Sequence, residues 1–237
     1  MTARSGRPEI WGALLLVVAG ASGISGDALG AEVAAEAAPA RTEVWQGTVA
    51  LRTTLVRDRG FDPFATTDAL PQLSLGVSRV LVRQGALALA LGLAFDTGAS
   101  DASARSAHAH LQVIRGSVPV ELRIAPLARA YAFGRVAPGL MRVSASLVDS
   151  SSPATMSGDF SGLSLDASAG VAVRLSPDRS VVGVWIEGDA GYGWTPSHEV
   201  VLQPGLGGAD QNKAGALTLA PLAARGAFGR LGLAVTY

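Results

Sequence analysis

The chain has 237 residues with 19 basic and 19 acidic side chains, so its formal net charge at pH 7 is zero. A neutral protein gains nothing from the field of a polyanion, and the composition therefore argues against a nucleic-acid partner. Apolar residues make up 49% of the chain and charged residues 16%, fewer than the quarter usual in soluble domains. The absence of cysteine excludes disulfides, thiol catalysis, thiolate metal sites and lipid attachment through an N-terminal cysteine.

The start of the chain predicts an export signal. Two arginines precede an apolar stretch over residues 11–21, and residues 28–30 form a cleavage site of the A-x-A kind. The alternative is a membrane anchor, for which this stretch is too short, since a helix needs ~20 apolar residues to span a bilayer. We therefore expect residues 1–30 to be a signal peptide and residues 31–43 to be a loose N-terminal tail.

Beyond this tail, apolar residues recur at every second position. The runs Leu87–Phe95 and Leu163–Leu175 are two examples, each alternating apolar residues with small or polar ones. A period of two places alternate side chains on opposite faces of a sheet. The pattern predicts an all-β fold of about eight strands, at residues 44–57, 71–83, 86–97, 105–124, 127–148, 161–175, 180–197 and 214–237.

The predicted connections alternate in length. Tight turns are expected at residues 84–85, around Pro126 and at residues 176–179. Longer polar loops are expected at residues 58–70, 98–104, 149–160 and 198–213. Outer-membrane barrels have short periplasmic turns and long outer loops, and a sheet that spans a bilayer must close to pair its backbone groups. We predict a closed antiparallel up-and-down transmembrane β-barrel over residues 44–237. Its expected location is the outer membrane of a Gram-negative bacterium, reached through the periplasm.

Two interruptions qualify this pattern. Gly116 separates Leu111 and Val113 from a lower half-strand of opposite parity that begins at Val118, and Pro138-Gly139 interrupts the following strand. We interpret each as a bulge that shifts the facing pattern. A barrel of ten strands, in which the long fifth and eighth strands are split, remains open, as does a soluble periplasmic β-sandwich.

If the apolar face meets lipid, charged side chains of both signs gather in the lumen. A barrel of about eight strands is just wide enough for side chains to fill it, and buried charges are tolerated when they are paired. We expect a salt-bridged interior plug rather than an open pore. Its predicted members are Arg52, Glu121, Arg123, Arg142, Asp166, Arg174, Glu187, Asp189 and Arg230.

The chain ends on an aromatic residue after alternating apolar positions, namely Leu231, Leu233, Val235 and Tyr237. This segment looks like the C-terminal signal of outer-membrane proteins. Residues 44–237 resemble the small OmpA/OmpX-type barrels in strand length and turn pattern. The resemblance implies an eight-stranded barrel set in outer-membrane lipid and lipopolysaccharide, with a C-terminal strand that the barrel-assembly machinery recognises.

The tetrapeptide Ala-Phe-Gly-Arg occurs twice, at residues 132–135 and 227–230. A duplicated half-barrel is one explanation. We favour two convergent wall segments, in which glycine relieves crowding and arginine reaches inward.

The three histidines are the main candidates for chemistry. His108 and His110 share one strand face at a spacing that suits metal chelation, but no third ligand is fixed nearby, and His198 lies in a distant loop. Some small barrels modify lipid A through His, Ser and a carboxylate. Here Ser197, His198 and Glu199 are adjacent, and adjacent strand residues point to opposite faces, so no triad forms locally. We expect no catalytic, cofactor or metal site.

The sequence therefore favours a non-enzymatic barrel with a structural or surface-interaction role carried by its outer loops. A lipid A-modifying enzyme and a narrow pore are the alternatives. The partner of the loops does not follow from the sequence.

Overall fold

The computed structural model describes residues 44–237 except residues 105, 128, 150–154, 178–179 and 206–214. The predicted signal peptide and N-terminal tail lie outside the described residues. Within the part of the chain that is described, no helix is long and apolar enough to cross a membrane.

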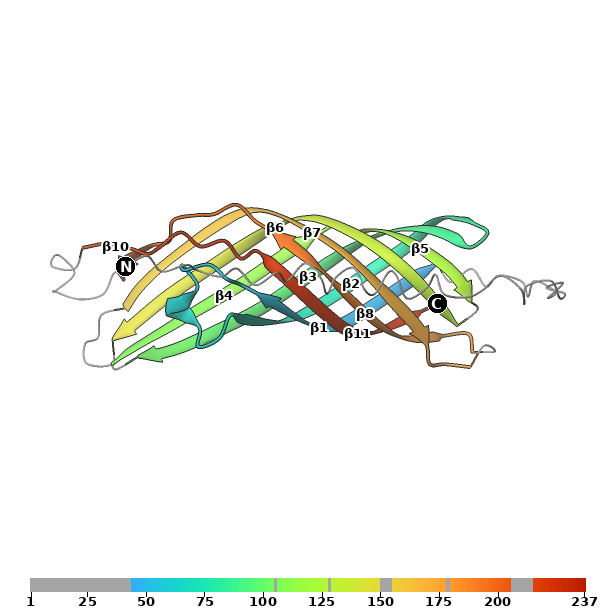
Figure 1. Cartoon of the computed structure of the whole chain (residues 1–237), viewed down its shortest axis with the longest axis horizontal. Coiled ribbons are helices and arrows are strands. Elements are labelled where there is room, and N and C mark those ends of the chain that lie inside the picture. Colours follow the sequence, from blue (N-terminus) through green and yellow to red (C-terminus); the bar gives the residue numbers. More distant parts are fainter. Residues whose placement is uncertain (1–43, 105, 128, 150–154, 178–179, 206–214) are drawn as a thin grey trace, which may run out of the picture. The chain divides into compact units, whose positions relative to one another are not determined.

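The described residues form antiparallel strands and one short 3-10 helix (Figure 1). In chain order they are β1 (Trp45–Leu55), η2 (Asp62–Phe64), β2 (Ala69–Gln84), β3 (Leu87–Ala104), β4 (Ala107–Ser117), β5 (Val120–Leu127), β6 (Ala130–Asp149), β7 (Thr155–Arg174), β8 (Gly183–Trp194), β9 (Val201–Pro204), β10 (Leu217–Thr218) and β11 (Gly226–Thr236).

The sheet closes into a ring of eight strand positions. β1 pairs with β2 on one side and with β11 on the other, so the first strand of the chain is joined to the last. β4 and β5 together fill one position, because both pair with β3 and with β6. The predicted closed eight-stranded antiparallel barrel is thus confirmed, and the ten-stranded alternative is wrong.

The tight turns lie together at one end of this ring. Gly85, in the turn between β2 and β3, has a φ of 57°, a left-handed conformation that glycine adopts without steric cost. The connections between β5 and β6 and between β7 and β8 lie at the same end, as predicted. The opposite end carries the connections between β1 and β2, β3 and β4, β6 and β7, and β8 and β11, and we call the part of the barrel at that end the outer half.

Several predicted loops are in fact strands. β3 runs to Ala104 and pairs with β4 from Ala107, and β7 begins at Thr155, so the loops expected at residues 98–104 and 149–160 are wrong in most of their length. Their Ser-, Asp- and Ala-rich composition resembles a loop because these hairpins are surrounded by water. Conversely, the eighth ring strand begins at Gly226 rather than at residue 214, since the short β10 pairs with β9 instead.

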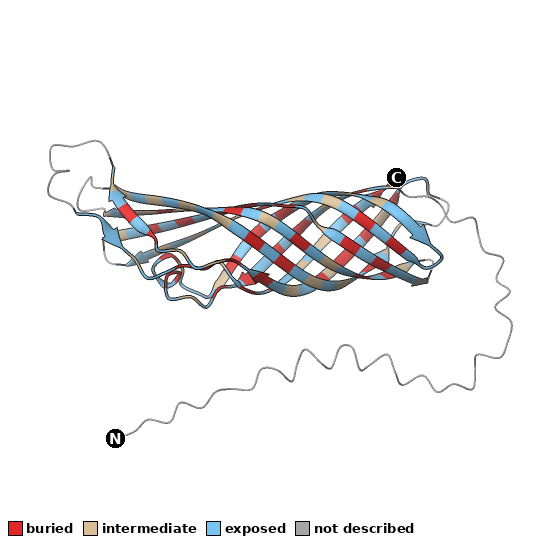
Figure 2. Cartoon of the chain, turned by 90° about the horizontal axis from the view of Figure 1, so that it is seen from above, coloured by how far each residue is buried: buried red, intermediate tan, exposed pale blue. Residues whose placement is uncertain are grey.

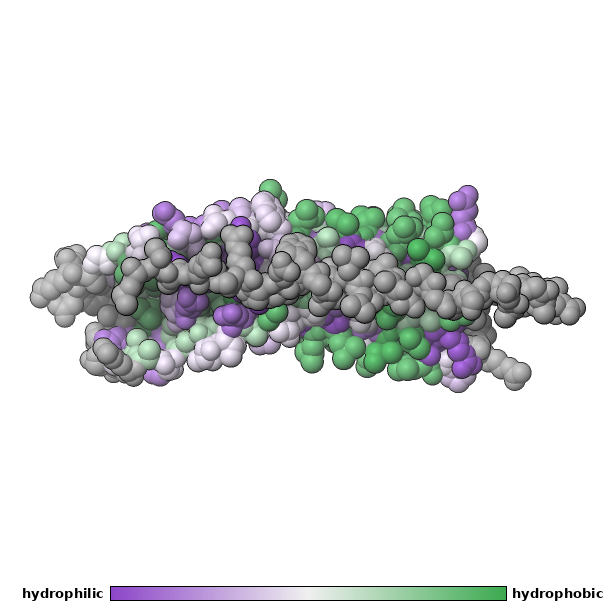
Figure 3. Space-filling model, in the orientation of Figure 1, coloured by the Kyte–Doolittle hydropathy of each residue, from purple (hydrophilic) through white to green (hydrophobic). Residues whose placement is uncertain are grey.

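The outer surface of the barrel divides into two zones. Buried and exposed residues alternate along the strands (Figure 2), and many of the outward side chains are large and apolar, such as Leu51, Leu163 and Leu231, each more than 60% exposed. Figure 3 shows these apolar residues gathered over the half of the barrel that carries the tight turns, whereas the outer half is mostly polar. An apolar belt around a closed sheet is the surface that a bilayer requires.

The facing of the strands does not change between the zones. Odd-numbered residues point inward on both sides of Gly116, from Leu111 and Val113 in β4 to Glu121 and Arg123 in β5, and the pairing register with β3 and β6 does not change at Gly116. The predicted facing shifts at Gly116 and at Pro138-Gly139 are therefore wrong. The surrounding medium changes instead, from lipid around the belt to water around the outer half. The belt therefore carries its apolar side chains on the outside, while the outer half carries them on the inside, like a soluble protein.

The interior is filled in three layers. The outer half holds an apolar core in which Phe61 and Phe64, from the connection after β1, pack with inward residues of β4 and β6 and with Leu222. Charged side chains fill the middle of the barrel. Towards the tight turns, an aromatic cluster contains Tyr131 and Trp185, whose ring centroids lie 5.1 Å apart. Side chains of all three layers thus occupy the interior of the described barrel.

Candidate functional site

The upper part of the charged layer is a group of four side chains, which we call the upper ion-pair group: Arg52, Asp96, Arg115 and Asp166. Asp166 accepts hydrogen bonds from Arg52 Nη1 at 2.6 Å and from Arg115 Nη1 at 2.7 Å. Arg115 Nη2 also donates to Asp96 Oδ2 at 2.7 Å. Each side chain is 7% exposed or less, and the two positive and two negative charges cancel.

Below it lies the lower ion-pair group, made of Glu121, Arg123, Arg135, Glu187, Asp189 and Arg230. Arg135 is central, with Nε donating to Glu121 Oε2 at 2.7 Å and Nη1 to Asp189 Oδ2 at 3.2 Å. Arg230 Nε donates to Asp189 Oδ1 at 3.0 Å. Three arginines face three carboxylates, so this group is also neutral. Neutral, hydrogen-bonded groups are the arrangement in which buried charge is tolerated.

The structure places all but one of the charged side chains predicted for the lumen inside the barrel. Arg174 is among them, near the tight turns, with its guanidinium 5.7 Å from the ring centroid of Trp185. Arg142 is the exception and its assignment was wrong. It lies on the outer surface of the outer half, 62% exposed, with Nη2 3.1 Å from Asp159 Oδ2.

Three members of the two groups were absent from the sequence prediction: Asp96, Arg115 and Arg135. Arg115 was missed because a shift of facing was expected at the next residue. Asp96 stood at the edge of an expected loop. Without a shift of facing at Gly116, every second residue counted back from Glu121 faces the lumen, and Arg115 is one of them.

The repeated Ala-Phe-Gly-Arg segments act as a pair inside the barrel. Arg135 lies 4.8 Å from the ring centroid of Phe133 and Arg230 lies 5.7 Å from that of Phe228. Both arginines bond to the same carboxylate, Asp189. The intervening glycines at positions 134 and 229 face outward, and a Cβ added there meets nothing within 4 Å. Relief of crowding was therefore the wrong reason for these glycines.

This geometry predicts that Gly134→Ala and Gly229→Ala leave the barrel intact and raise its free energy of unfolding by up to about 0.5–1 kcal/mol, the strand-interior cost of glycine relative to alanine. The matched control is Gly191→Ala, whose Cβ would collide with the backbone oxygen of Ala167. Urea unfolding followed by gel mobility measures all three. Destabilisation at position 134 or 229 equal to that at position 191 would contradict the geometry.

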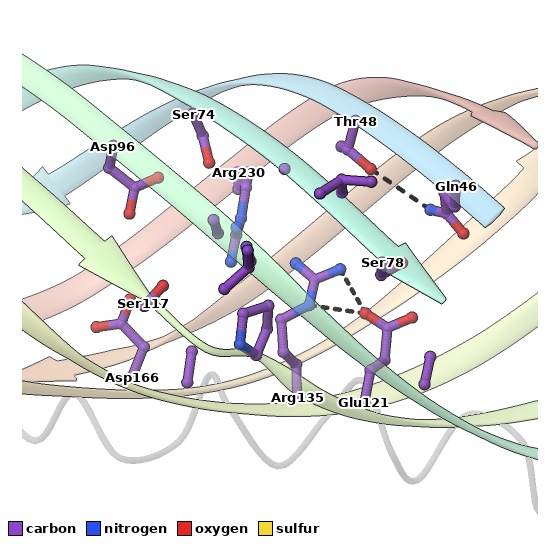
Figure 4. A pocket seen from close by; sticks show the side chains of 17 residues that line it. Gln46, Thr48, Ser74, Ser78, Asp96, Ser117, Glu121, Arg135, Asp166 and Arg230 are labelled. Atoms are coloured by element: carbon purple, nitrogen blue, oxygen red, sulfur yellow. Dashed lines mark hydrogen bonds and ion pairs between the residues drawn. The ribbon is translucent and has the colours of Figure 1, made fainter. Parts of the chain in front are cut away.

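A small cavity lies in the charged layer (Figure 4). It has a volume of about 40 Å³ and is bordered by Gln46, Ser74, Asp96, Glu121 and Arg135, among others. A cavity of this size holds a few water molecules at most.

The histidines are not brought together. His108 Nδ1 lies 2.8 Å from Ser103 Oγ and His110 Nδ1 lies 2.6 Å from Asp101 Oδ1, both near the exposed tip of the β3–β4 hairpin. His198 packs against Phe160, with ring centroids 4.9 Å apart, between β8 and β9. Among the described residues, no group of three or more His, Asp or Glu is arranged to hold a metal ion.

A polar groove of about 600 Å³ lies on the outward face of β4, β6, β7 and β9 in the outer half. We call it the outer groove. It was not predicted, because its residues on β7 and β9 were assigned to loops and Arg142 was assigned to the lumen. Its side chains are His110, Gln112, Arg142, Ser144, Ser146, Ser157, Asp159, Val201, Gln203 and Pro204, with Ala145, Gly158 and Gly205 completing the lining.

The last strand lies in the apolar belt. Leu231, Leu233, Val235 and Tyr237 all point outward, between 44% and 66% exposed. β11 closes the ring by pairing with β1 and β8, so the sheet has no free edge in the bilayer. The protein has the fold of a transmembrane β-barrel. Recognition of its C-terminal strand by the assembly machinery stays a prediction.

No protein-family model matches the chain, and a search of curated proteins finds no match. Its fold is similar to that of solved outer-membrane barrels. These include the attachment invasion locus protein Ail of Yersinia pestis in complex with the heparin analogue sucrose octasulfate (12% identity, TM-score 0.44, covering 81% of this chain and 96% of that one). They also include Neisserial surface protein A (12% identity, TM-score 0.44, covering 81% of this chain and 95% of that one). A third is the outer membrane protease OmpT of Escherichia coli (8% identity, TM-score 0.45, covering 82% of this chain and 94% of that one).

Proposed function

We propose that this barrel is a non-conducting surface-interaction protein whose rigid outer half presents the binding surface. The length of its strands carries the proposal. A strand needs roughly 9–11 residues to cross the bilayer, whereas β6 and β7 have 20 residues each. About half of each strand thus stands outside the membrane, around an apolar core that spanning does not require.

The filled interior argues against a pore. We expect the purified full chain to be electrically silent in planar bilayers, because two neutral ion-pair groups and an apolar core occupy the lumen. Insertion is verified in the same sample by heat-modifiable gel mobility. Steady conductance steps from correctly inserted protein would refute a non-conducting role.

The histidine positions argue against a lipid-modifying enzyme. Leu140, the last large apolar side chain on the outward face of β6 before Arg142, pairs with Gly116, and His108 is eight residues further out, roughly 25 Å along the strand. Lipid esters at the membrane surface are out of its reach. His198 faces the inner side of the wall, where a Cβ added at Gly162 would lie 2.9 Å from its Nε2.

The binding role itself is tested on cells. Bacteria that display the full chain are compared with bacteria that display a barrel whose β3–β4 and β6–β7 hairpins are shortened to the level of the belt. Binding to panels of glycans and matrix proteins is the readout, and heat-modifiable mobility verifies that both barrels fold. We expect the short barrel to lose a binding activity that the full chain has. Identical binding profiles would overturn the proposal.

A further inference from the structure

The outer groove is built from strands rather than from loops, so its side chains form a regular array. His110, Ser146, Ser157 and Gln203 are paired in register across β4, β6, β7 and β9. A second row, Gln112, Ser144 and Asp159, runs parallel to it two residues nearer the membrane. Neighbouring strands are about 4.8 Å apart and alternate residues about 7 Å apart, which fixes the spacing of these polar groups.

The wall behind the array is rigid. Inward residues on the same strands, Leu111, Met141 and Val143, are 3% exposed or less and belong to the apolar core of the outer half. His110 is further held by its contact with Asp101. A ligand on this face therefore meets groups that are already placed, and little ordering cost opposes binding.

The chemistry of the lining selects the class of ligand. Amides, hydroxyls and an imidazole offer both donors and acceptors. The one arginine, Arg142, is balanced by Asp159, and this exposed pair is worth little by itself in water, so its polar atoms remain usable by a ligand. Val201 and Pro204 add a small apolar patch at one side. The groove volume lies within the range of about 300–1,000 Å³ common for small-molecule sites.

From this array we infer that the outer groove binds a short, neutral or zwitterionic oligosaccharide. Sugar rings carry alternating hydroxyls that match a fixed grid of donors and acceptors, and their C–H faces match the small apolar patch. A polyanion would need an excess of positive charge, which the groove does not have. The inference rests on the proposed surface-interaction role and names its ligand class.

The height of the groove above the apolar belt is compatible with two sources for such a sugar. The last apolar row of the belt on this side pairs Leu140 with Leu163, and Arg142 stands in the next row outward. The groove thus begins roughly 7 Å above the belt along the strand and ends roughly 20 Å above it. Sugars of glycolipids in the surrounding outer leaflet lie at this level, and free glycans reach it from outside.

The test uses the full chain in phospholipid nanodiscs that contain no glycolipid. One arm titrates it with the core oligosaccharide released from lipopolysaccharide, and the other with an array of neutral, zwitterionic and sulfated free glycans. Ser144→Trp fills the groove without disturbing the lumen. His108→Trp is the control, on the same face of β4 but outside the groove lining.

We expect Ser144→Trp to weaken saccharide binding at least tenfold and His108→Trp to leave it unchanged. Binding in the first arm assigns the membrane's own glycolipid as the source, and binding only to neutral glycans in the second assigns a free one. No saccharide binding, binding only to sulfated glycans, or equal binding by Ser144→Trp would overturn the inference. In that case, cell-surface binding that still depends on the long hairpins would leave the proposed function standing.

Discussion

Replacing Asp166 with alanine lowers the free energy of unfolding of the barrel by about 3–5 kcal/mol, the cost of breaking a buried pair from one side. Asp166 bonds to both Arg52 and Arg115, and neither arginine reaches water, since their side chains are 2% and 5% exposed. Asp96 alone would then face two guanidinium groups. Urea or guanidinium unfolding in detergent micelles, followed by gel mobility, measures the change.

The matched control is Asp159→Ala on the same strand, β7. Asp159 also pairs with an arginine, but both partners are more than half exposed, so its loss costs about 0–1 kcal/mol. The two substitutions remove the same group from the same strand and differ in burial. Equal unfolding midpoints for the two variants would show that the upper ion-pair group does not stabilise the barrel as its geometry implies.

Replacing Phe64 with alanine destabilises the outer half by about 3–5 kcal/mol, because it leaves a cavity in a packed core. Phe64 is 1% exposed and lies in η2, the element that brings the connection after β1 against β3 and β4. Hydrogen exchange resolves the effect by region. We expect faster exchange in the extended ends of β4, β6 and β7 than in the belt.

Phe95→Ala serves as the comparison for this second substitution. Phe95 points outward at the upper edge of the belt, 45% exposed, so lipid or detergent chains fill the space that its ring leaves. Its loss should change exchange in the outer half little. If Phe64→Ala left exchange there unchanged as well, the apolar core would not be what holds the outer half together.

The period of two was sufficient to predict most of the fold. It gave the eight ring positions and the tight turns, because alternation and turn residues are local properties of the chain. It did not distinguish a polar strand from a polar loop. The residues around Asp101 and Ser157 were assigned to loops on composition, yet they pair regularly in extended hairpins.

The assignment of inward and outward faces was accurate in the apolar belt, where lipid surrounds the strands. In the belt, alternate charged residues such as Arg52 and Glu187 lie inside, as the rule of apolar outside and polar inside demands. The rule fails for Arg142, because β6 leaves the bilayer just before it and continues into water. The sequence marks that boundary by the change in parity of its apolar residues near Gly116 and Pro138-Gly139, but this change was interpreted as a bulge.

The sequence by itself determined that this chain forms strands and that its lumen carries charges of both signs, and it favoured eight strands in the ring. The tertiary structure alone decided which arginine meets which carboxylate, how far the barrel extends beyond the membrane, and that polar residues of four strands line one outer groove. The physical reason is range. Alternation acts between neighbours in the chain, whereas ion pairs such as Arg52 with Asp166, 114 residues apart, form only once the sheet has closed.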